Sequence, residues 1–504
     1  MKHLLLLALL VPMPLIAATC DSDGSAASVQ ACHDAAADGD TITVPSGSFA
    51  WTTTVSFTKA ITLQGAGAIS STNGGAGTTG SDVTTIVDHH PTSEHKLLGF
   101  TVASGKTARL TAINFLSDGT TTNTQAGMIQ ISGGSNCIRI DHNHFTYSVT
   151  TGGAPSTIAV YGGVTGVIDH NYFDQPLGNG PVGVYLQNGV QPGDAEYSAA
   201  NDYGSDKFIY MEDNRWRNGY LGDANTGGQR FVYRYNTGVM EFDDTHQGQG
   251  YVANHGITPG RGRSSRAFEF YKNVMGAQSP GLNKSPMPIN GGTGIVWGNT
   301  ISQYRYVTSL DYTRKDNTTY NYLTTPTSWG NCDGTTGTVW DGPGGGYPCL
   351  DQPGRGQGDL LSGSFPNVIN TRTGTAAQVI QALSPIYVFN NTLNPAGYSP
   401  TPITNIQGPA ALIQANREFY QQFGTNGETG TFDGTRGVGE GLLSARSSTC
   451  TTGVGYWATD TQTLYVASAT NVWSIYYQPY TYPHPLTGVN PNPTPRGHRR
   501  GHRP

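Results

Sequence analysis

The sequence is poor in charged residues: Asp, Glu, Lys and Arg together make up 12% of its 504 residues, about half the usual share of roughly 25%. A coiled coil or a long helical bundle needs these residues in bulk, together with Ala and Leu, so both classes are excluded. The formal net charge is −6. Because a general nucleic-acid binder is usually basic, we expect no nucleic-acid partner.

Long apolar runs are missing beyond the N-terminus. Residues 1–18 have the features of a secretory signal peptide: Lys2 in a short basic region, an apolar stretch, and Ala17 and Ala18 before the cleavage site. The apolar stretch is too short to span a bilayer. We therefore expect a secreted, monomeric protein without a membrane span. Cys20, which follows Thr19, leaves lipid attachment open as an alternative.

Cysteine is also scarce, with six residues and no Cys/His spacing typical of structural zinc. Export makes disulfides plausible, although six cysteines allow 15 pairings. Short connecting loops favour two pairs and leave two thiols free and buried. The expected pairs are Cys20–Cys32 and Cys332–Cys349, and the expected free thiols are Cys137 and Cys450.

Glycine and aromatic residues are abundant instead, with 68 Gly, 27 Tyr, 16 Phe and 7 Trp. So many aromatics exclude a disordered chain. Within this composition one short pattern recurs seven times: two apolar residues at alternate positions, two further residues, and then Asn. The recurring residues are Asn143, Asn171, Asn214, Asn236, Asn273, Asn299 and Asn391.

The spacing of these asparagines indicates a parallel β-solenoid. Steps of 22–28 residues fit one coil, and longer steps fit a coil with an inserted loop. Because side chains alternate along a strand, the residues three and five positions before each Asn fill the core. Each Asn is expected at a bend, in a left-handed backbone, with its amide bonded to the Asn of the next coil. A β-sandwich with repeated Asn turns is the alternative.

These repeats, together with residues 38–47 (DGDTITVPSG), Trp51 and residues 61–67 (ITLQGAG), resemble the coils of secreted bacterial β-helix proteins. Over roughly residues 20–400 the chain resembles the right-handed parallel β-helix proteins of the pectate-lyase-like superfamily. The resemblance implies an all-β solenoid that begins with a short capping helix at residues 26–37, which the Cys20–Cys32 disulfide would pin. It says little about activity, because one fold hosts many chemistries.

The predicted organisation has four parts: the signal peptide at residues 1–18, the parallel β-helix at 19–400, a small β-rich C-terminal cap at 401–490, and a disordered basic tail at 491–504. An aromatic sugar-binding module is the alternative for the third part. Within it we expect a helix at residues 409–423 from the apolar spacing, and a three-strand meander at residues 455–459, 463–467 and 472–477. The Pro-rich residues 480–485 are expected to lie extended along the body.

Ionisable residues are concentrated in residues 241–272, and we expect them to converge on one exposed cleft. His transfers protons near neutrality and Arg binds carboxylates, which are the two functions that a uronate lyase needs. The alternative is that these are ordinary loop residues, which are solvated or paired with one another and form no functional cleft. The predicted catalytic residues are His255, Arg261, Arg266, His246 and Lys272. The predicted substrate-binding residues are Asp243, Asp244, Arg263, Glu269, Tyr271, Trp297 and Arg234. Glu241 belongs to the same cluster.

A second candidate is a stripe two positions before each repeated Asn, where the side chains should point outward. It changes from acidic to aromatic along the solenoid: Asp141, Asp169, Glu212, Arg234, Tyr271, Trp297 and Phe389. Carboxylates one coil apart could hold Ca²⁺, which prefers oxygen ligands. The predicted metal ligands are Asp141, Asp169 and Glu212. A covering loop over the aromatics, with the acids simply solvated, is the alternative.

The sequence therefore predicts a secreted polysaccharide-active protein, first as a lyase that cleaves uronate-containing glycan by β-elimination. A polygalacturonase-like hydrolase is the first alternative, because Asp243–Asp244 and the turn with His255 faintly resemble its motifs. Such a hydrolase needs two carboxylates at a defined separation. A non-catalytic glycan-binding or adhesion protein is the second alternative. The sequence requires no cofactor, and Ca²⁺ is the one ion that the acidic residues of the stripe could hold.

Overall fold

The computed structural model describes most of the chain from residue 17 to residue 488. The described residues are 17–67, 83–92, 95–117, 127–147, 156–174, 182–187, 200–218, 220–226, 228–240, 252–254, 265–277, 285–311, 352–357, 382–395, 397, 402–407 and 413–488.

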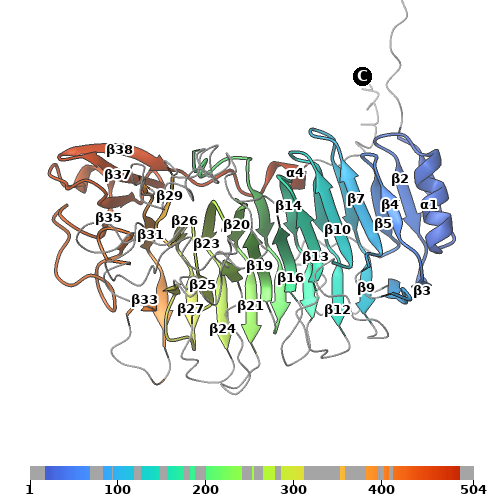
Figure 1. Cartoon of the computed structure of the whole chain (residues 1–504), viewed down its shortest axis with the longest axis horizontal. Helices are drawn as coiled ribbons and strands as arrows, with labels where there is room; N and C mark the ends of the chain where they lie inside the picture. Colours follow the sequence, from blue (N-terminus) through green and yellow to red (C-terminus); the bar gives the residue numbers. More distant parts are fainter. Residues whose placement is uncertain are drawn as a thin grey trace, which may run out of the picture.

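Three parallel sheets form the body, and each coil of the chain adds one strand to each sheet in turn (Figure 1). Sheet A contains β1 (Thr19–Asp21), β2 (Thr41–Val44), β5 (Thr62–Gly65), β8 (Ala108–Thr111), β11 (Ile138–Asp141), β14 (Gly166–Asp169), β17 (Ile209–Glu212), β20 (Arg230–Arg234), β23 (Ala267–Tyr271), β26 (Thr293–Trp297), β31 (Ile386–Phe389) and β34 (Phe419–Gln421).

The other two sheets complete each coil. Sheet B contains β3 (Gly47–Trp51), β6 (Thr84–Asp88), β9 (Asn114–Ser117), β12 (His144–Tyr147), β15 (Tyr172–Asp174), β18 (Arg215–Arg217), β21 (Thr237–Met240), β24 (Val274–Ala277), β27 (Thr300–Ser302) and β32 (Thr392–Asn394). Sheet C contains β4 (Val55–Phe57), β7 (Leu98–Val102), β10 (Ile129–Gly133), β13 (Ser156–Tyr161), β16 (Val182–Gln187), β19 (Tyr220–Thr226), β22 (Val252–Asn254), β25 (Met287–Ile289), β28 (Thr308–Asp311) and β33 (Thr404–Gln407). This arrangement confirms the predicted parallel β-helix.

Strand register explains why the inward positions of the repeat are apolar. Ile140 in β11 is aligned with Ile168 in β14, and Ile168 is aligned with Met211 in β17. All three side chains are buried in the core of the solenoid. Like residues stack from coil to coil because the parallel strands place the same repeat position one above the other.

An asparagine ladder runs along the turn between sheets A and B. Asn143 donates from its backbone N–H and from Nδ2 to Oδ1 of Asn171, at 3.0 and 3.1 Å. The same pair of bonds links each predicted Asn to the next, as far as Asn391. The predicted ladder is therefore confirmed.

One detail of the ladder prediction was wrong. The left-handed backbone belongs to the residue before each Asn, such as His142 (φ 55°) and Tyr235 (φ 57°). One left-handed residue suffices to bend the chain between the two sheets, and it lies where no ladder bond is made. The Asn residues contribute through their hydrogen bonds instead.

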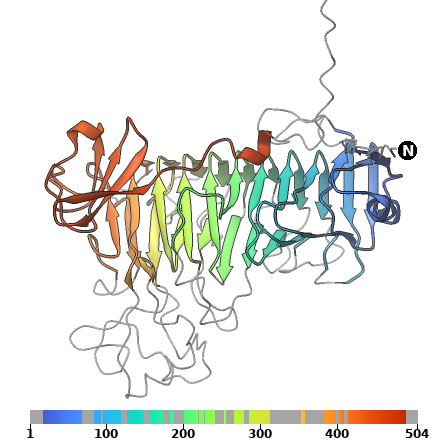
Figure 2. The same cartoon turned by 90° about the horizontal axis from the view of Figure 1, so that it is seen from above.

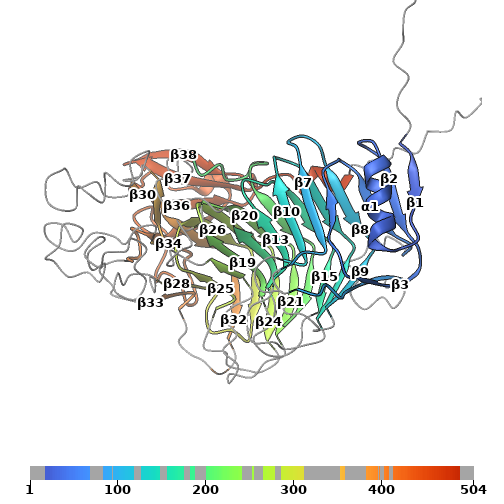
Figure 3. The same ribbon diagram turned by 45° about the vertical axis from the view of Figure 1, so that its right-hand side comes forward.

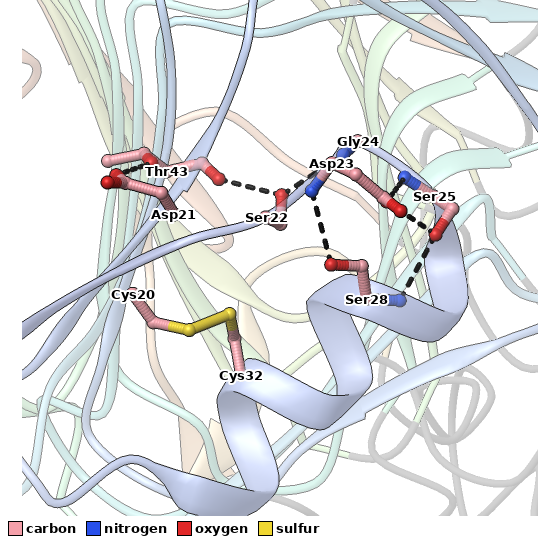
Figure 4. The surroundings of a disulfide bond; sticks show 9 residues. All are labelled: Cys20, Asp21, Ser22, Asp23, Gly24, Ser25, Ser28, Cys32 and Thr43. Carbon is pink, nitrogen blue, oxygen red and sulfur yellow. Dashed lines mark hydrogen bonds between the residues drawn. A yellow bond between two sulfur atoms is a disulfide. The ribbon is translucent and has the colours of Figure 1, made fainter.

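A short helix caps the N-terminal end of the solenoid, as predicted, and Figure 3 shows it across that end. Helix α1 spans Ala26–Ala35, and the Ser25 hydroxyl accepts a hydrogen bond from the backbone N–H of Ser28 at its start. The Cys20–Cys32 disulfide joins β1 to this helix (Figure 4). Cys137 and Cys450 are free and buried, as expected. Cys332 and Cys349 lie outside the described residues.

The C-terminal part differs from the prediction in two ways. The solenoid continues beyond residue 400, because β33 and β34 extend sheets C and A. The helix expected at residues 409–423 is wrong for residues 413–423, which form turns and β34. Phe419 and Tyr420 pair in parallel with Ile386 and Tyr387, so sheet pairing overrides the helical spacing of the apolar residues.

A separate four-stranded sheet follows and confirms the predicted meander. Its strands are β35 (Val438–Gly441), β36 (Gly455–Ala458), β37 (Thr463–Ala469) and β38 (Val472–Tyr477), and the last three are antiparallel neighbours. The remaining described elements are the paired strands β29 (Arg355–Gln357) and β30 (Ala382–Leu383), and the short helices η4 (Leu443–Ala445) and α4 (Pro485–Gly488). None of the helices in the described part of the chain is long and apolar enough to cross a membrane.

After β38 the chain turns back along the body, as Figure 2 shows. Residues 478–488, which we call the strap, lie over the outer face of sheet A and end in α4 beside β14. Arg234 of β20 donates to the carbonyl oxygens of Tyr480 and Thr481, which fixes the first half of the strap. Residues 480–485 therefore lie along the body as predicted.

Candidate functional site

The outward stripe of sheet A begins as a row of buried ion pairs. Arg109 donates to both carboxylate oxygens of Asp141, at 2.7 and 2.6 Å. Arg139 donates in the same way to Asp169, at 3.1 and 3.0 Å. Burial opposes ionisation of Asp141, but its hydrogen bonds to Arg109 and His142 and the nearby arginine charges outweigh burial and hold its pKa below the usual range.

The three predicted metal ligands therefore bind protein groups. Glu212 accepts a hydrogen bond from Arg234 Nε at 2.6 Å and another from the backbone N–H of His484 at 2.8 Å. Asp141, Asp169 and Glu212 are completely buried. Among the described residues, no group of three or more His, Cys, Asp or Glu side chains could hold a metal ion. A cation at this stripe would have to displace arginines.

The strap explains this burial. Besides the two bonds from Arg234, Arg139 Nη1 donates to the carbonyl oxygen of Thr487 at 3.1 Å. The Tyr482 hydroxyl donates to the Asp213 carboxylate at 2.9 Å. Outward-pointing residues of sheet A are thus covered by a segment that follows them in the chain by more than 200 residues. The sequence-based alternative, a covering loop over the aromatics with solvated acids, is therefore wrong for the acids: they are buried, and the strap rather than an inserted loop lies over the stripe.

Two residues of the predicted cleft are also buried. Glu269 of β23 accepts hydrogen bonds from the backbone N–H of Gly204 at 2.7 Å and from the Tyr477 hydroxyl at 2.9 Å. Burial raises the pKa of Glu269 to about 7. Arg266, which precedes β23, is fully buried, and its charge acts on Tyr203 and Tyr476. The expectation that these residues line an exposed cleft is wrong, because residues 200–206 and the end of β38 cover them.

The rest of the predicted cluster lies outside the described residues. These residues are Glu241, Asp243, Asp244, His246, His255, Arg261 and Arg263.

A pocket of about 450 Å³ opens where the strap leaves the four-stranded sheet. Its walls come from the outer face of sheet A, from the turn between β36 and β37, and from the strap. The lining residues are Tyr235, Tyr271, Trp297, Thr461, Gln462, Gln478, Pro479, Tyr480, Thr481 and Tyr482. Half of the ten belong to the strap, so the pocket exists only while the strap is docked.

Aromatic rings form the walls of this pocket in stacked pairs. Tyr271 and Trp297 stack with their centroids 4.9 Å apart, and Tyr235 stacks on Tyr482 at 3.7 Å. The exposed ammonium group of Lys272 lies 5.2 Å from the centre of the Trp297 ring. The site therefore combines aromatic faces with amide and hydroxyl groups, and has a cation beside it.

The Tyr482 hydroxyl is held in the protonated state. Partial desolvation of the hydroxyl and the charge of Asp213, to which the hydroxyl donates, raise the pKa of Tyr482, although the residue as a whole is exposed. Burial also raises the pKa of Asp213. Because its hydrogen is donated to Asp213, the Tyr482 hydroxyl presents its oxygen lone pairs to a ligand and can accept a hydrogen bond from it.

The structure brings together three of the predicted site residues, since Tyr271 and Trp297 line the pocket and Lys272 lies beside it. Sequence reasoning missed the strap residues Tyr480 and Tyr482. The sequence did predict that residues 480–485 lie along the body. It did not show which coil these residues contact, so it could not place them at the pocket.

Comparisons with known proteins identify no family for this chain. No protein-family model matches the sequence, and no curated protein matches it. Among solved structures, the chain is similar to an alginate lyase from Paenibacillus sp. str. FPU-7, with 14% identity and a TM-score of 0.29. The match covers 58% of this chain and 99% of that chain.

Proposed function

We propose that the protein is a secreted polysaccharide-active protein that binds a sugar unit in the pocket between sheet A and the strap. The observation that carries this proposal is the lining of the pocket, which combines five aromatic side chains with Gln462, Gln478, two threonines and Pro479. A sugar ring has an apolar face that packs on aromatic rings and hydroxyl groups that bond to amides and hydroxyls. The volume of about 450 Å³ suits a small ligand.

We further propose that the glycan contains uronate. Lys272 places an ammonium group beside Trp297, where it could pair with a sugar carboxylate. The signal-peptide features of residues 1–18 and the Cys20–Cys32 disulfide support export of the protein. Such polymers occur outside the cell.

The reaction that fits these groups is β-elimination. A base removes the proton at C5 of the uronate, the bond between C4 and the bridging oxygen breaks, a C4–C5 double bond forms, and the leaving oxygen takes up a proton. In this proposal Lys272 neutralises the carboxylate, Tyr482, oriented by Asp213, accepts a hydrogen bond from a sugar hydroxyl and positions the ring, and the leaving oxygen takes its proton from water. His246 and His255 remain the candidates for the base, and Arg261 and Arg263 for further carboxylate binding.

The hydrolase alternative finds less support among the described residues. Asp141, Asp169, Glu212 and Glu269 on the outer face of sheet A are buried and bonded to arginines, to a tyrosine or to backbone N–H groups. A glycosidase needs two carboxyl groups that flank the scissile bond.

A screen of neutral and acidic polysaccharides tests the proposal, with binding measured by calorimetry and products by two assays. Elimination yields an unsaturated sugar with ultraviolet absorbance as well as new reducing ends, whereas hydrolysis yields reducing ends alone. Binding without either product would support the adhesion protein, and no binding to any acidic glycan would overturn the proposal.

Two variants locate the site. Tyr482→Phe should weaken saccharide binding about tenfold, since it removes an oriented hydrogen-bond acceptor from the wall of the pocket. Lys272→Met should weaken binding of acidic chains selectively. Lys106→Met is the matched control, because Lys106 is an exposed lysine at the N-terminal end of the solenoid. Wild-type affinity in Tyr482→Phe would remove Tyr482 from the binding site.

A further inference from the structure

Two polar side chains of the strap, Gln478 and Tyr482, line the pocket at either end of the segment that forms its wall. Both residues are exposed, so a ligand can reach them. A polar group whose hydrogens are already committed to the protein can meet a ligand in one sense only, as a donor or as an acceptor. The directions of the hydrogen bonds around these two residues therefore restrict what the pocket can bind.

A chain of two hydrogen bonds orients the amide group of Gln478. The hydroxyl of Thr463, the buried first residue of β37, donates to the carbonyl oxygen of Thr461 at 3.0 Å. A hydroxyl has one hydrogen, so the Thr463 oxygen can only accept from the Gln478 amide, which lies 3.0 Å away. The amide must therefore turn its NH₂ group towards Thr463, and this contact fixes the positions of its nitrogen and oxygen.

The carbonyl end of the same amide, Oε1 of Gln478, is left for a ligand. Within the described part of the chain this atom accepts no hydrogen bond. An amide oxygen never donates, so a ligand group that meets Oε1 must be a donor. The side chains of Gln462 and Thr461 have no such fixed partner among the described residues. They can rotate to suit a donor or an acceptor, and so discriminate less between ligands.

Tyr482 provides a second fixed acceptor. Its hydroxyl hydrogen is directed to the two carboxylate oxygens of Asp213, at 2.9 and 3.0 Å. The lone pairs of the phenolic oxygen remain available to a ligand. The strap thus presents two acceptors to the pocket, one at Gln478 and one at Tyr482.

Other polar groups around the pocket are bound to the protein itself. The indole N–H of Trp297 donates to the Tyr477 hydroxyl at 3.2 Å. The carbonyl oxygens of Tyr480 and Thr481 accept from Arg234 at 2.8 and 2.9 Å. These bonds hold the wall of the pocket in place, and they leave the two side-chain acceptors as the oriented groups that can distinguish one ligand from another.

We propose that the strap selects free hydroxyl groups: a sugar unit binds through hydroxyls that donate to Gln478 Oε1 and to the Tyr482 oxygen, and glycans with acyl or alkyl groups on these hydroxyls are rejected. The inference deepens the proposed function and rests on it for the choice of a saccharide. An ester or ether oxygen has no hydrogen, so it would place lone pairs against lone pairs. A carboxylate is disfavoured at both points for the same reason, which turns the acidic group of the sugar towards Lys272.

Calorimetry with matched ligands tests the selection. The probes are the dimers of glucuronic, galacturonic, mannuronic and guluronic acid, each with free hydroxyls, with O-acetylated hydroxyls, and with single hydroxyls replaced by hydrogen. Any dimer that binds should lose affinity about tenfold for each hydrogen bond that acetylation or deoxygenation removes. Equal affinity for the free and the O-acetylated forms would overturn the inference while leaving the proposed function in place. If no dimer binds in any form, the proposed function fails and the inference fails with it.

A variant of Gln478 assigns the selection to its amide. Gln478→Leu should bind the free dimer about tenfold more weakly than the wild type does, and should bind one of the deoxy dimers as well as the wild type does, because that bond is already absent. The matched control is Gln64→Leu, since Gln64 is a partly buried glutamine of β5 on a distant coil of sheet A. It should change neither affinity. If Gln478→Leu weakens the free dimer and every deoxy dimer by the same factor, the amide does not read a hydroxyl.

Thr463 acts in this inference as a positioning residue. Thr463→Val keeps the shape of the side chain but removes the hydroxyl that orients the amide, so Gln478 can turn either end towards the ligand. The preference for the free over the deoxy dimer should therefore narrow, whereas a purely structural role would weaken both ligands equally. Wild-type preference in a folded Thr463→Val protein would overturn the orienting chain. The Gln478→Leu comparison decides the inference even if Thr463→Val folds poorly, because Gln478 is exposed.

Discussion

Arg234 Nη1 donates a hydrogen bond to the carbonyl oxygen of Tyr480 at 2.8 Å, across 246 residues of sequence. The same guanidinium group also pairs with Glu212 in the neighbouring strand. One side chain on the outer face of the solenoid therefore holds both its own sheet and the returning C-terminus. This contact joins the repeat-built body and the strap into one functional unit.

The asparagine ladder should be a major local source of stability. Asn236→Ala would remove the acceptor for Asn214 and leave backbone groups unpaired in a buried turn, which costs about 1–3 kcal/mol. Chemical unfolding measures the loss. Asn394→Ala, at an exposed asparagine of β32, is the control, and equal stability of the two variants would contradict a stabilising ladder.

Acid should weaken the fold through His484. Burial and the nearby arginine charges lower the pKa of His484 to about 4, so the folded protein prefers the neutral ring. The stability associated with neutral His484 is present above the unfolded pKa of about 6.5 and is lost as pH falls through about 4, up to about 3 kcal/mol in total. His484→Gln should flatten the free energy of unfolding over this range, and an unchanged acid slope would contradict the assignment.

Arg266 should be a structural residue. Because its side chain is fully buried, Arg266→Ala should lower the free energy of unfolding by about 3 kcal/mol and leave saccharide binding by the folded fraction intact. Arg215→Ala, at an exposed arginine of β18, should change neither quantity. Loss of glycan cleavage in a fully stable Arg266→Ala protein would return Arg266 to the catalytic residues.

The Cys20–Cys32 disulfide should stabilise the N-terminal cap. It closes a loop with a sequence separation of 12, and such a cross-link is worth about 3 kcal/mol in the chain-entropy model. Cys32→Ser should lower the melting midpoint and increase hydrogen exchange in α1 before the rest of the solenoid. Non-reducing peptide mapping that recovers both cysteines as free thiols would contradict the bond.

The ladder was predictable because its residues repeat. Asn143 and Asn171 lie 28 residues apart and bond directly. Residues one sequence period apart are therefore also neighbours in space. The helix expected at residues 409–423 shows the limit of this reasoning. The apolar spacing there fits a helix, but Phe419 and Tyr420 pair instead with strand β31 at the edge of sheet A.

Only the pocket residues that belong to sheet A could be predicted from the sequence. The repeat register correctly pointed Tyr271 and Trp297 away from the core, and both line the pocket. It also pointed Asp169, Glu212 and Glu269 outward, which suggested exposure. All three are buried, because a register states the direction of a side chain and says nothing about what later covers it.

The sequence by itself thus determined the interior of this protein: the parallel coils, the stacked core, the asparagine ladder and the disulfide-pinned cap. The coils, the core and the ladder depend on alternation within a strand or on contacts between neighbouring coils, which leave a periodic signal, whereas the cap was expected from the family resemblance and the disulfide from the short loop between Cys20 and Cys32. Only the tertiary structure decided the exterior: the pocket, the ion pairs beneath the strap and the burial of Glu269. Those contacts join residues such as Glu269 and Tyr477, 208 positions apart, whose pairing depends on where a non-repeating segment docks and has no counterpart in any local pattern.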